Sequence, residues 1–263
     1  MNRFVSTDGV RLSYYEWGTP NGSRPVVLHH GFAVDANANW VVPGVVDALV
    51  KAGHHVVGID ARGHGRSDKP HDPAVYGENI MARDLSILLD VLEYTEVDLI
   101  GYSMGGVVAA ITATRDARIR RLILGGVGCA IVELGGVDRR VFEGISVVDV
   151  LLTEDPDEIA ASLARPFRVL ADAVGADRHA LVAQLRAVHR APIPLANISA
   201  PTLVLAGQDD PLSTKPELLA AAIPGARCLT VPGDHLTAVR TPEFTSAIVE
   251  FFASAEKPSA KLT

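Results

Sequence analysis

A Gly-x-Ser-x-Gly pattern near the middle of the chain constrains the fold more than any other feature of the sequence. Residues 97–100 form a short, mainly apolar run that suits a buried strand, and they lead into Gly-Tyr-Ser-Met-Gly at residues 101–105. The apolar residues 107–111 can then continue as a helix. A sharp strand-to-helix turn leaves no room for side chains beside the serine, so glycine is needed on both sides. The pattern predicts that Ser103 stands at such a turn, with its hydroxyl projecting from the edge of a sheet.

The helix that begins at Met104 bears on the chemistry of this serine. Its free N–H groups and its positive dipole end point toward Ser103, which favours negative charge on a group held there. The alternative is a glycine-rich turn with an incidental serine, because a bare Gly-x-Ser-x-Gly also occurs by chance. The strand before the motif and the helix after it favour the functional interpretation.

Strand-like apolar runs alternate with helical patterns on both sides of the motif. The further strand-like runs are 25–29, 54–60, 121–127, 201–207 and 227–231. The helical patterns are 45–52, 78–94, 215–223 and 242–253. Such alternation predicts the α/β class, with a mostly parallel central sheet and helices on both faces. Residues 4–15 read as a hairpin that turns at Asp8-Gly9, which would add antiparallel strands at one edge.

The alternation stops between residues 129 and 199. No strand-like run appears in this stretch, which is far longer than an ordinary connection. Helical patterns occupy 141–152, 156–163, 166–174 and 179–188. We therefore expect residues 129–199 to form a helical cap, inserted into a core domain made of residues 1–128 and 200–263.

Two polar loops after predicted strands supply partners for the serine. A serine hydroxyl attacks a carbonyl at neutral pH only with help from a base. Residues 207–211 (Gly-Gln-Asp-Asp-Pro) follow one strand, and residues 232–236 (Pro-Gly-Asp-His-Leu) follow the next. Because catalytic groups in such sheets come from loops after the carboxyl ends of the strands, we expect an aspartate and His235 to lie beside Ser103. The order along the chain is serine, acid, histidine.

At this point the sequence resembles the α/β-hydrolase fold superfamily, in its serine esterase- and lipase-like branch with a helical cap. The stretches that carry the resemblance are 30–32 (His-Gly-Phe), 60–67, 101–106, 207–211 and 233–235. The resemblance implies that Ser103 is the nucleophile and His235 the general base, then the general acid. It implies that Asp210 holds the other nitrogen of the imidazole. The backbone N–H groups of Phe32 and Met104 would form the oxyanion hole.

Asp209 competes with Asp210 for the position of the acid. In sequences of this family the acid usually stands three residues after the loop glycine and just before proline, which favours Asp210 and leaves Asp209 as a solvated carboxylate. Some relatives carry the acid after the preceding strand, but that loop, residues 125–130, contains no carboxylate here. We expect His30 to support the oxyanion loop by hydrogen bonds rather than to transfer protons.

Other features argue against several classes of protein. The net charge of −7 offers no basic surface for nucleic acid. Neither a metal-ligand spacing nor a Gly-x-Gly-x-x-Gly after the first parallel strand is present, so we expect no metal and no cofactor. The apolar runs are shorter than the ~20 residues of a membrane span, and the N-terminus lacks a signal peptide's apolar run. Cys129 and Cys228 read as two buried free thiols, which suits a cytoplasmic protein.

The substrate is constrained less closely than the mechanism. Ser103 implies an acyl-enzyme, and it argues against haloalkane or epoxide opening, because the relatives with those activities carry aspartate there. Apolar residues of the predicted cap would line an acyl pocket. The cap arginines at 139, 140, 165 and 168 form no evident cluster, so we predict an uncharged, small to medium carboxylic ester or lactone. Carbon–carbon bond hydrolysis, hydroxynitrile cleavage, cofactor-free perhydrolysis and a non-catalytic ligand-binding role remain alternatives.

Overall fold

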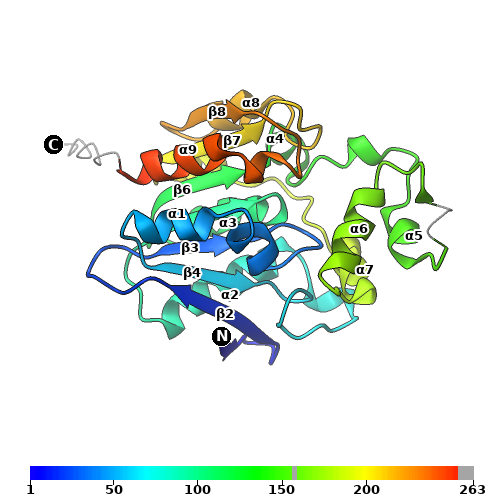
Figure 1. The fold of residues 1–263 in the computed structure, drawn as a ribbon, viewed down its shortest axis with the longest axis horizontal. Helices are drawn as coiled ribbons and strands as arrows, with labels where there is room; N and C mark the ends of the chain where they lie inside the picture. Colours follow the sequence, from blue (N-terminus) through cyan, green and yellow to red (C-terminus); the bar gives the residue numbers. More distant parts are fainter. Residues whose placement is uncertain (156–158, 254–263) are drawn as a thin grey trace.

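The computed structural model describes residues 1–155 and 159–253, which form one eight-stranded sheet flanked by helices (Figure 1). The strand order is β1-β2-β4-β3-β5-β6-β7-β8. The strands β1 (Asn2–Val5) and β2 (Arg11–Trp17) form the predicted antiparallel hairpin, and β2 also runs antiparallel to β4. The parallel strands are β3 (Val26–His29), β4 (Val56–Asp60), β5 (Val97–Tyr102), β6 (Ile119–Gly125), β7 (Thr202–Gly207) and β8 (Arg227–Val231). The predicted fold class is confirmed.

Helices cover both faces of the sheet, because successive side chains of each buried strand point to opposite sides. On β5, Leu99 packs with α2 (Glu78–Val91) and α3 (Met104–Ala113), whereas Ile100 packs with α1 (Val45–Lys51) and α9 (Pro242–Ala253). The short helix α8 (Pro216–Ala221) lies on the α2 and α3 side. Figure 1 shows α1 and α9 together in front of the sheet.

The helices between β6 and β7 lie beyond the carboxyl ends of the parallel strands (Figure 1). They are α4 (Ala130–Leu134), α5 (Val147–Leu152), α6 (Arg165–Ala173) and α7 (Arg178–Arg186). The helix predicted at 141–152 is shorter, because Gly144 with φ of 78° interrupts it. The one predicted at 156–163 begins outside the described residues, and 159–163 are not α-helical. The boundary between a core and a cap stays a prediction.

Several short helical segments carry no periodic signal in the sequence. They are η1 (Asn37–Val41), η2 (Pro73–Val75), η3 (Arg140–Phe142), η5 (Leu195–Asn197) and η6 (Ala238–Arg240). Both cysteines are free, as predicted, but Cys228 is exposed rather than buried, because it lies on the edge strand β8. None of the helices in the described residues is long and apolar enough to cross a membrane.

Candidate active site

Ser103 occupies the sharp turn between β5 and α3. Its φ of 54° and ψ of −116° are unusual for a residue with a side chain, and its N–H donates to the carbonyl of Gly125 at 2.8 Å. Both flanking residues must be glycine, because a Cβ atom at either position would overlap a backbone carbonyl oxygen. A Cβ on Gly101 would lie 2.0 Å from the carbonyl oxygen of Gly105, and one on Gly105 would lie 2.2 Å from that of His29. The turn therefore holds the Ser103 hydroxyl at the carboxyl edge of the sheet.

Three side chains from three loops meet at this edge. His235 follows β8, and its Nε2 lies 2.9 Å from Ser103 Oγ. Its Nδ1 lies 2.9 Å from Asp210 Oδ2, on the loop after β7. When Nδ1–H donates to the carboxylate, the lone pair of Nε2 faces the serine hydroxyl and can accept its proton. All three side chains are more than nine-tenths buried.

Further hydrogen bonds fix this arrangement. The second oxygen of Asp210 accepts the backbone N–H of Leu212 at 2.8 Å, and the phenol of Tyr102 donates to the carbonyl of His235 at 2.7 Å. Burial raises the pKa of Tyr102 well above its usual value, so the phenol keeps its proton and remains a donor. This role of Tyr102 cannot be predicted from the sequence, since the motif leaves that position free.

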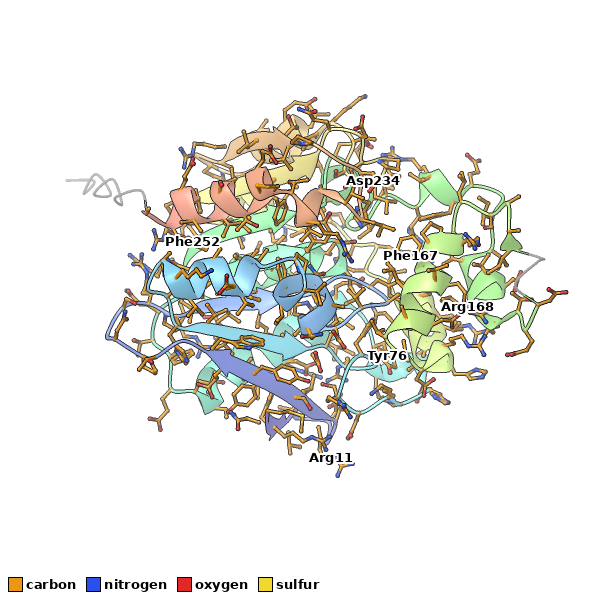
Figure 2. All side chains as sticks on the ribbon, viewed as in Figure 1. Arg11, Tyr76, Phe167, Arg168, Asp234 and Phe252 are labelled. Atoms are coloured by element: carbon orange, nitrogen blue, oxygen red, sulfur yellow. The ribbon has the colours of Figure 1, made fainter. Side chains whose placement is uncertain are left out.

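Of the two neighbouring aspartates, the structure brings Asp210 to the histidine. Asp210 is buried, whereas Asp209 is exposed and points into solvent on the same loop. The neighbouring Asp234 caps its own turn, accepting from Thr237, and Figure 2 shows it at the surface near the end of β8. Of the carboxylates of Asp209, Asp210 and Asp234, therefore, only that of Asp210 forms a hydrogen bond with Nδ1 of His235.

The loop after β3 is held on two sides by buried side chains. Nε2 of His30 accepts the N–H of Ala61 at 2.9 Å, so its Nδ1 carries the proton and donates to the carbonyl of Gly31 at 2.7 Å. On the other side, Asn39 Oδ1 accepts the N–H of Gly31 at 2.8 Å. His30 therefore supports this loop by hydrogen bonds, as the sequence predicts. Asn39 was not predicted, because it lies on the irregular turn η1.

The two N–H groups predicted to form an oxyanion hole are those of Phe32 and Met104. Met104 begins α3, where an N–H has no partner within the helix. In the described part of the chain, no group accepts a hydrogen bond from either N–H. Both groups are therefore available to an oxygen atom bound near Ser103.

Two cavities meet at Ser103. The first has a volume of about 370 Å³ and the second of about 400 Å³. Phe32, Ser103 and Phe167 line both, and the two phenylalanine rings are 6.1 Å apart. Phe167 lies on α6, on the side that faces the sheet (Figure 2). Met104 lines only the first cavity and His235 only the second.

Most residues that line the first cavity are apolar, but Arg139 and Arg190 line it as well. No arginine cluster is evident in the sequence, because these two residues are 51 positions apart (190 − 139). In residues 1–155 and 159–253, no three His, Cys, Asp or Glu side chains are grouped so that they could hold a metal ion.

Comparisons with known proteins agree with the fold. A family model described as "alpha/beta hydrolase fold" matches residues 24–133. The non-heme chloroperoxidase of Streptomyces lividans is 32% identical over 129 residues, 47% of this chain and 44% of that protein. The chain spans about half the length of the first curated relatives that it matches.

Solved structures match nearly the whole chain. A hydrolase from Pseudomonas aeruginosa PA01 has a TM-score of 0.75 and 29% identity, covering 96% of this chain and 98% of the other. A thermophilic esterase from Thermogutta terrifontis has a TM-score of 0.71 and 28% identity, covering 96% and 98%. Together with the sheet order, these matches show that the chain has the α/β-hydrolase fold.

Proposed function

We propose that the protein is a serine hydrolase that cleaves a carboxylic ester or lactone. The observation that carries the proposal is the pair of 2.9 Å hydrogen bonds that link Asp210, His235 and Ser103. Further support comes from the free N–H groups of Phe32 and Met104, and from the esterase and hydrolase among the similar structures. Other folds use the same set of side chains for acyl transfer.

In the proposed reaction, Ser103 Oγ attacks the carbonyl carbon while its proton passes to His235 Nε2. The carbonyl oxygen becomes an oxyanion and accepts hydrogen bonds from Phe32 N–H and Met104 N–H. The bond to the leaving oxygen then breaks as His235 returns the proton to that oxygen. Water repeats the sequence on the acyl-enzyme, which releases the acid and restores Ser103. Asp210 keeps the imidazole oriented and stabilises its charged form.

We propose an uncharged group next to the reacting carbonyl. The side chains of Phe32, Met104 and Phe167 surround that position, and a charge there would lose its hydration without gaining a partner. A small to medium acyl chain matches the cavity of about 370 Å³.

Labelling with a reactive phosphonate ester tests the proposal, because this probe reacts with an activated serine. We expect intact mass to show one adduct on the wild type and none on Ser103→Ala or His235→Ala. Ser213→Ala serves as the matched control, since Ser213 is also buried but its hydroxyl has no partner in the described residues. Ser103→Ala should also abolish hydrolysis of methyl hexanoate. An unlabelled, folded wild type would contradict the proposed function and favour a non-catalytic binding role.

Cofactor-free perhydrolysis is a second candidate, and the chloroperoxidase relative favours it. Hydrogen peroxide would replace water as the attacker of the acyl-enzyme and would yield a peracid. Addition of peroxide to the ester assay, with peracid as the readout, separates the two outcomes. Formation of acid alone at high peroxide would exclude this candidate.

A further inference from the structure

The two cavities beside Ser103 have different roles under the proposed function, on which this inference rests. His235 must return a proton to the leaving oxygen, so the alcohol part of an ester lies on the side of His235. His235 lines the cavity of about 400 Å³ and does not line the other. The acyl chain therefore extends into the cavity of about 370 Å³, which Met104 lines.

The acyl cavity carries two arginines in an otherwise mainly apolar lining. Arg139 comes from the segment after α4, and Arg190 comes from the segment after α7. Both residues are exposed, so this part of the cavity lining is in contact with solvent. Ser103 and Met104, which line the same cavity, are buried. A chain attached to the reacting carbonyl would thus pass apolar side chains before it reaches the guanidinium groups.

Two glycines bring these segments together. A Cβ on Gly135 would lie 2.1 Å from the carbonyl oxygen of Ala191, and one on Gly136 would lie 2.9 Å from that of His189. Because neither glycine has a side chain, the backbones of residues 135–136 and 189–191 pack directly against each other. This contact places Arg139 and Arg190 on one cavity.

The two guanidinium groups carry uncompensated charge. Neither has a carboxylate oxygen within 4.0 Å in the described residues, whereas the adjacent Arg140 pairs with Asp138 at 2.7 Å and Glu133 at 2.6 Å. Partial burial lowers the pKa of Arg139, and the positive charge of Arg190 lowers it further. The two cations therefore repel each other, and a bound anion would relieve that repulsion.

Glu78 is the acidic residue in the lining of this cavity, but it does not neutralise the arginines. Its Oε2 accepts the N–H of His189 at 2.6 Å, and its Oε1 accepts from Gln184 at 3.3 Å. Burial raises the pKa of Glu78, and its carboxylate oxygens are taken up by these two donors rather than by a guanidinium group. Its effect on Arg139 is smaller than that of burial and of Arg190.

We propose that Arg139 and Arg190 bind a carboxylate at the far end of the acyl chain, so that the preferred substrates are half-esters of dicarboxylic acids. The reacting carbonyl then lies among apolar side chains, and the second carboxylate accepts charge-assisted hydrogen bonds from the two guanidinium groups. Such a substrate is uncharged beside the scissile bond and anionic at its other end, and it therefore differs from the wholly uncharged ester or lactone predicted from the sequence.

Two methyl esters with the same chain length test this preference. Monomethyl adipate carries the distal carboxylate, and methyl hexanoate has a methyl group in its place. We expect the wild type to hydrolyse monomethyl adipate with the higher kcat/KM. In Arg139→Gln/Arg190→Gln, we expect the ratio of the two kcat/KM values to fall about 10- to 100-fold, mainly through a higher KM for monomethyl adipate. The wild-type ratio should also fall as salt rises from about 0.05 M to about 1 M, because salt screens exposed charges.

Arg186→Gln is the matched control. Arg186 lies in the last turn of α7, is exposed, and does not line the cavity, so its loss removes one positive charge outside the cavity, against two inside it in the double variant. We expect the wild-type ratio in this variant. An equal ratio in the wild type and the double variant would overturn the proposal.

A separate measurement distinguishes failure of this inference from failure of the proposed function. If Ser103 accepts the phosphonate but neither ester turns over, protection of Ser103 by monomethyl adipate and by methyl hexanoate measures the same preference. If Ser103 is not labelled, the proposed function fails. Calorimetric titration of adipate into the wild type and the double variant then tests the arginine pair alone, and equal affinities would refute it.

Discussion

Asp209 and Asp210 are neighbours in the chain, but only the Asp210 carboxylate lies within hydrogen-bond distance of His235 Nδ1. Asp210→Asn would replace the acceptor with an amide that can present its N–H₂ group to the ring. The imidazole would then turn to the wrong tautomer, with a proton on Nε2 facing Ser103. A comparison of Asp210→Asn with Asp209→Asn therefore distinguishes the carboxylate that orients His235 from the one that is exposed to solvent.

We expect Asp210→Asn to lower kcat for ester hydrolysis by about 1,000- to 10,000-fold. Asp209→Asn should have a far smaller effect, because its carboxylate is exposed. Steady-state kinetics on methyl hexanoate, with thermal unfolding to verify that both variants fold, provides the comparison. The reverse ranking would assign the orienting role to Asp209.

The residues that meet at Ser103 divide into those with a sequence signal and those without one. Ser103, Asp210 and His235 were predicted because each follows a recognisable strand and stands in a polar, glycine-containing loop. Asn39 and Tyr102 were not, because their hydrogen bonds depend on how loops pack. No local pattern requires an asparagine eight residues after Gly31, although its amide oxygen holds the Gly31 N–H.

At the scale of elements, the turn between β5 and α3 brings the start of α3 into close contact with β3. A Cβ on Gly105 would lie 2.2 Å from the carbonyl oxygen of His29, a backbone atom of β3 that cannot move alone. By contrast, a Cβ on Gly106 would meet the side chain of Val127 at 3.1 Å and the Gly125 carbonyl oxygen at 3.2 Å. A methyl group on Gly105 would thus overlap a backbone atom of β3, whereas one on Gly106 would only make tight contacts with Val127 and Gly125.

We expect Gly105→Ala to lower the free energy of unfolding by about 3 kcal/mol or more, since β3 and α3 must separate. Gly106→Ala should cost much less, because a small shift of Val127 relieves the contact and alanine favours the helix by about 1 kcal/mol. Urea unfolding of both variants provides the measurement. Equal midpoints would show that the turn tolerates a wider separation of β3 and α3.

Elements of the sheet were easier to predict than those between β6 and β7. Every strand predicted from an apolar run exists. Burial on both faces leaves a continuous apolar signature in the central strands, although the edge strand β8 is mostly exposed. The helix predicted at 141–152 is cut short at Gly144, and α4 was not predicted at all. α4 and α5 are only five and six residues long, too short for a clear helical period, whereas the longer α6 and α7 match the predicted patterns at 166–174 and 179–188.

At the scale of the whole molecule, it could not be predicted from the sequence that Arg139 and Arg190 line the same cavity. Their proximity depends on the backbone contact of Gly135 and Gly136 with residues 189–191, which follows from the packing of two distant segments. By contrast, the mostly parallel sheet with helices on both faces could be predicted, because strands and helices alternate over most of the chain.

Two buried histidines make the stability of the whole molecule sensitive to acid. His29 lies on β3 and His64 lies in the loop after β4, and burial lowers the pKa of each to about 3. The neighbouring His30 lowers both further. In the unfolded chain a histidine takes up a proton near pH 6.5. Stability from the neutral rings is therefore full above pH 6.5 and is lost as pH falls from 6.5 toward 3.

His64→Asn tests this linkage at one of the two sites. The Asn amide can replace the Nδ1–H that donates to the carbonyl of Arg62, but it does not titrate. Each neutral buried histidine adds up to about 1.4 kcal/mol per pH unit to the slope of unfolding free energy against pH. We expect the slope between pH 6.5 and 4.5 to be shallower in the variant, as measured by urea unfolding at each pH. Parallel curves would show that the His64 ring gains its proton without unfolding. The carboxylates are common to both proteins, so their titration cancels in the comparison.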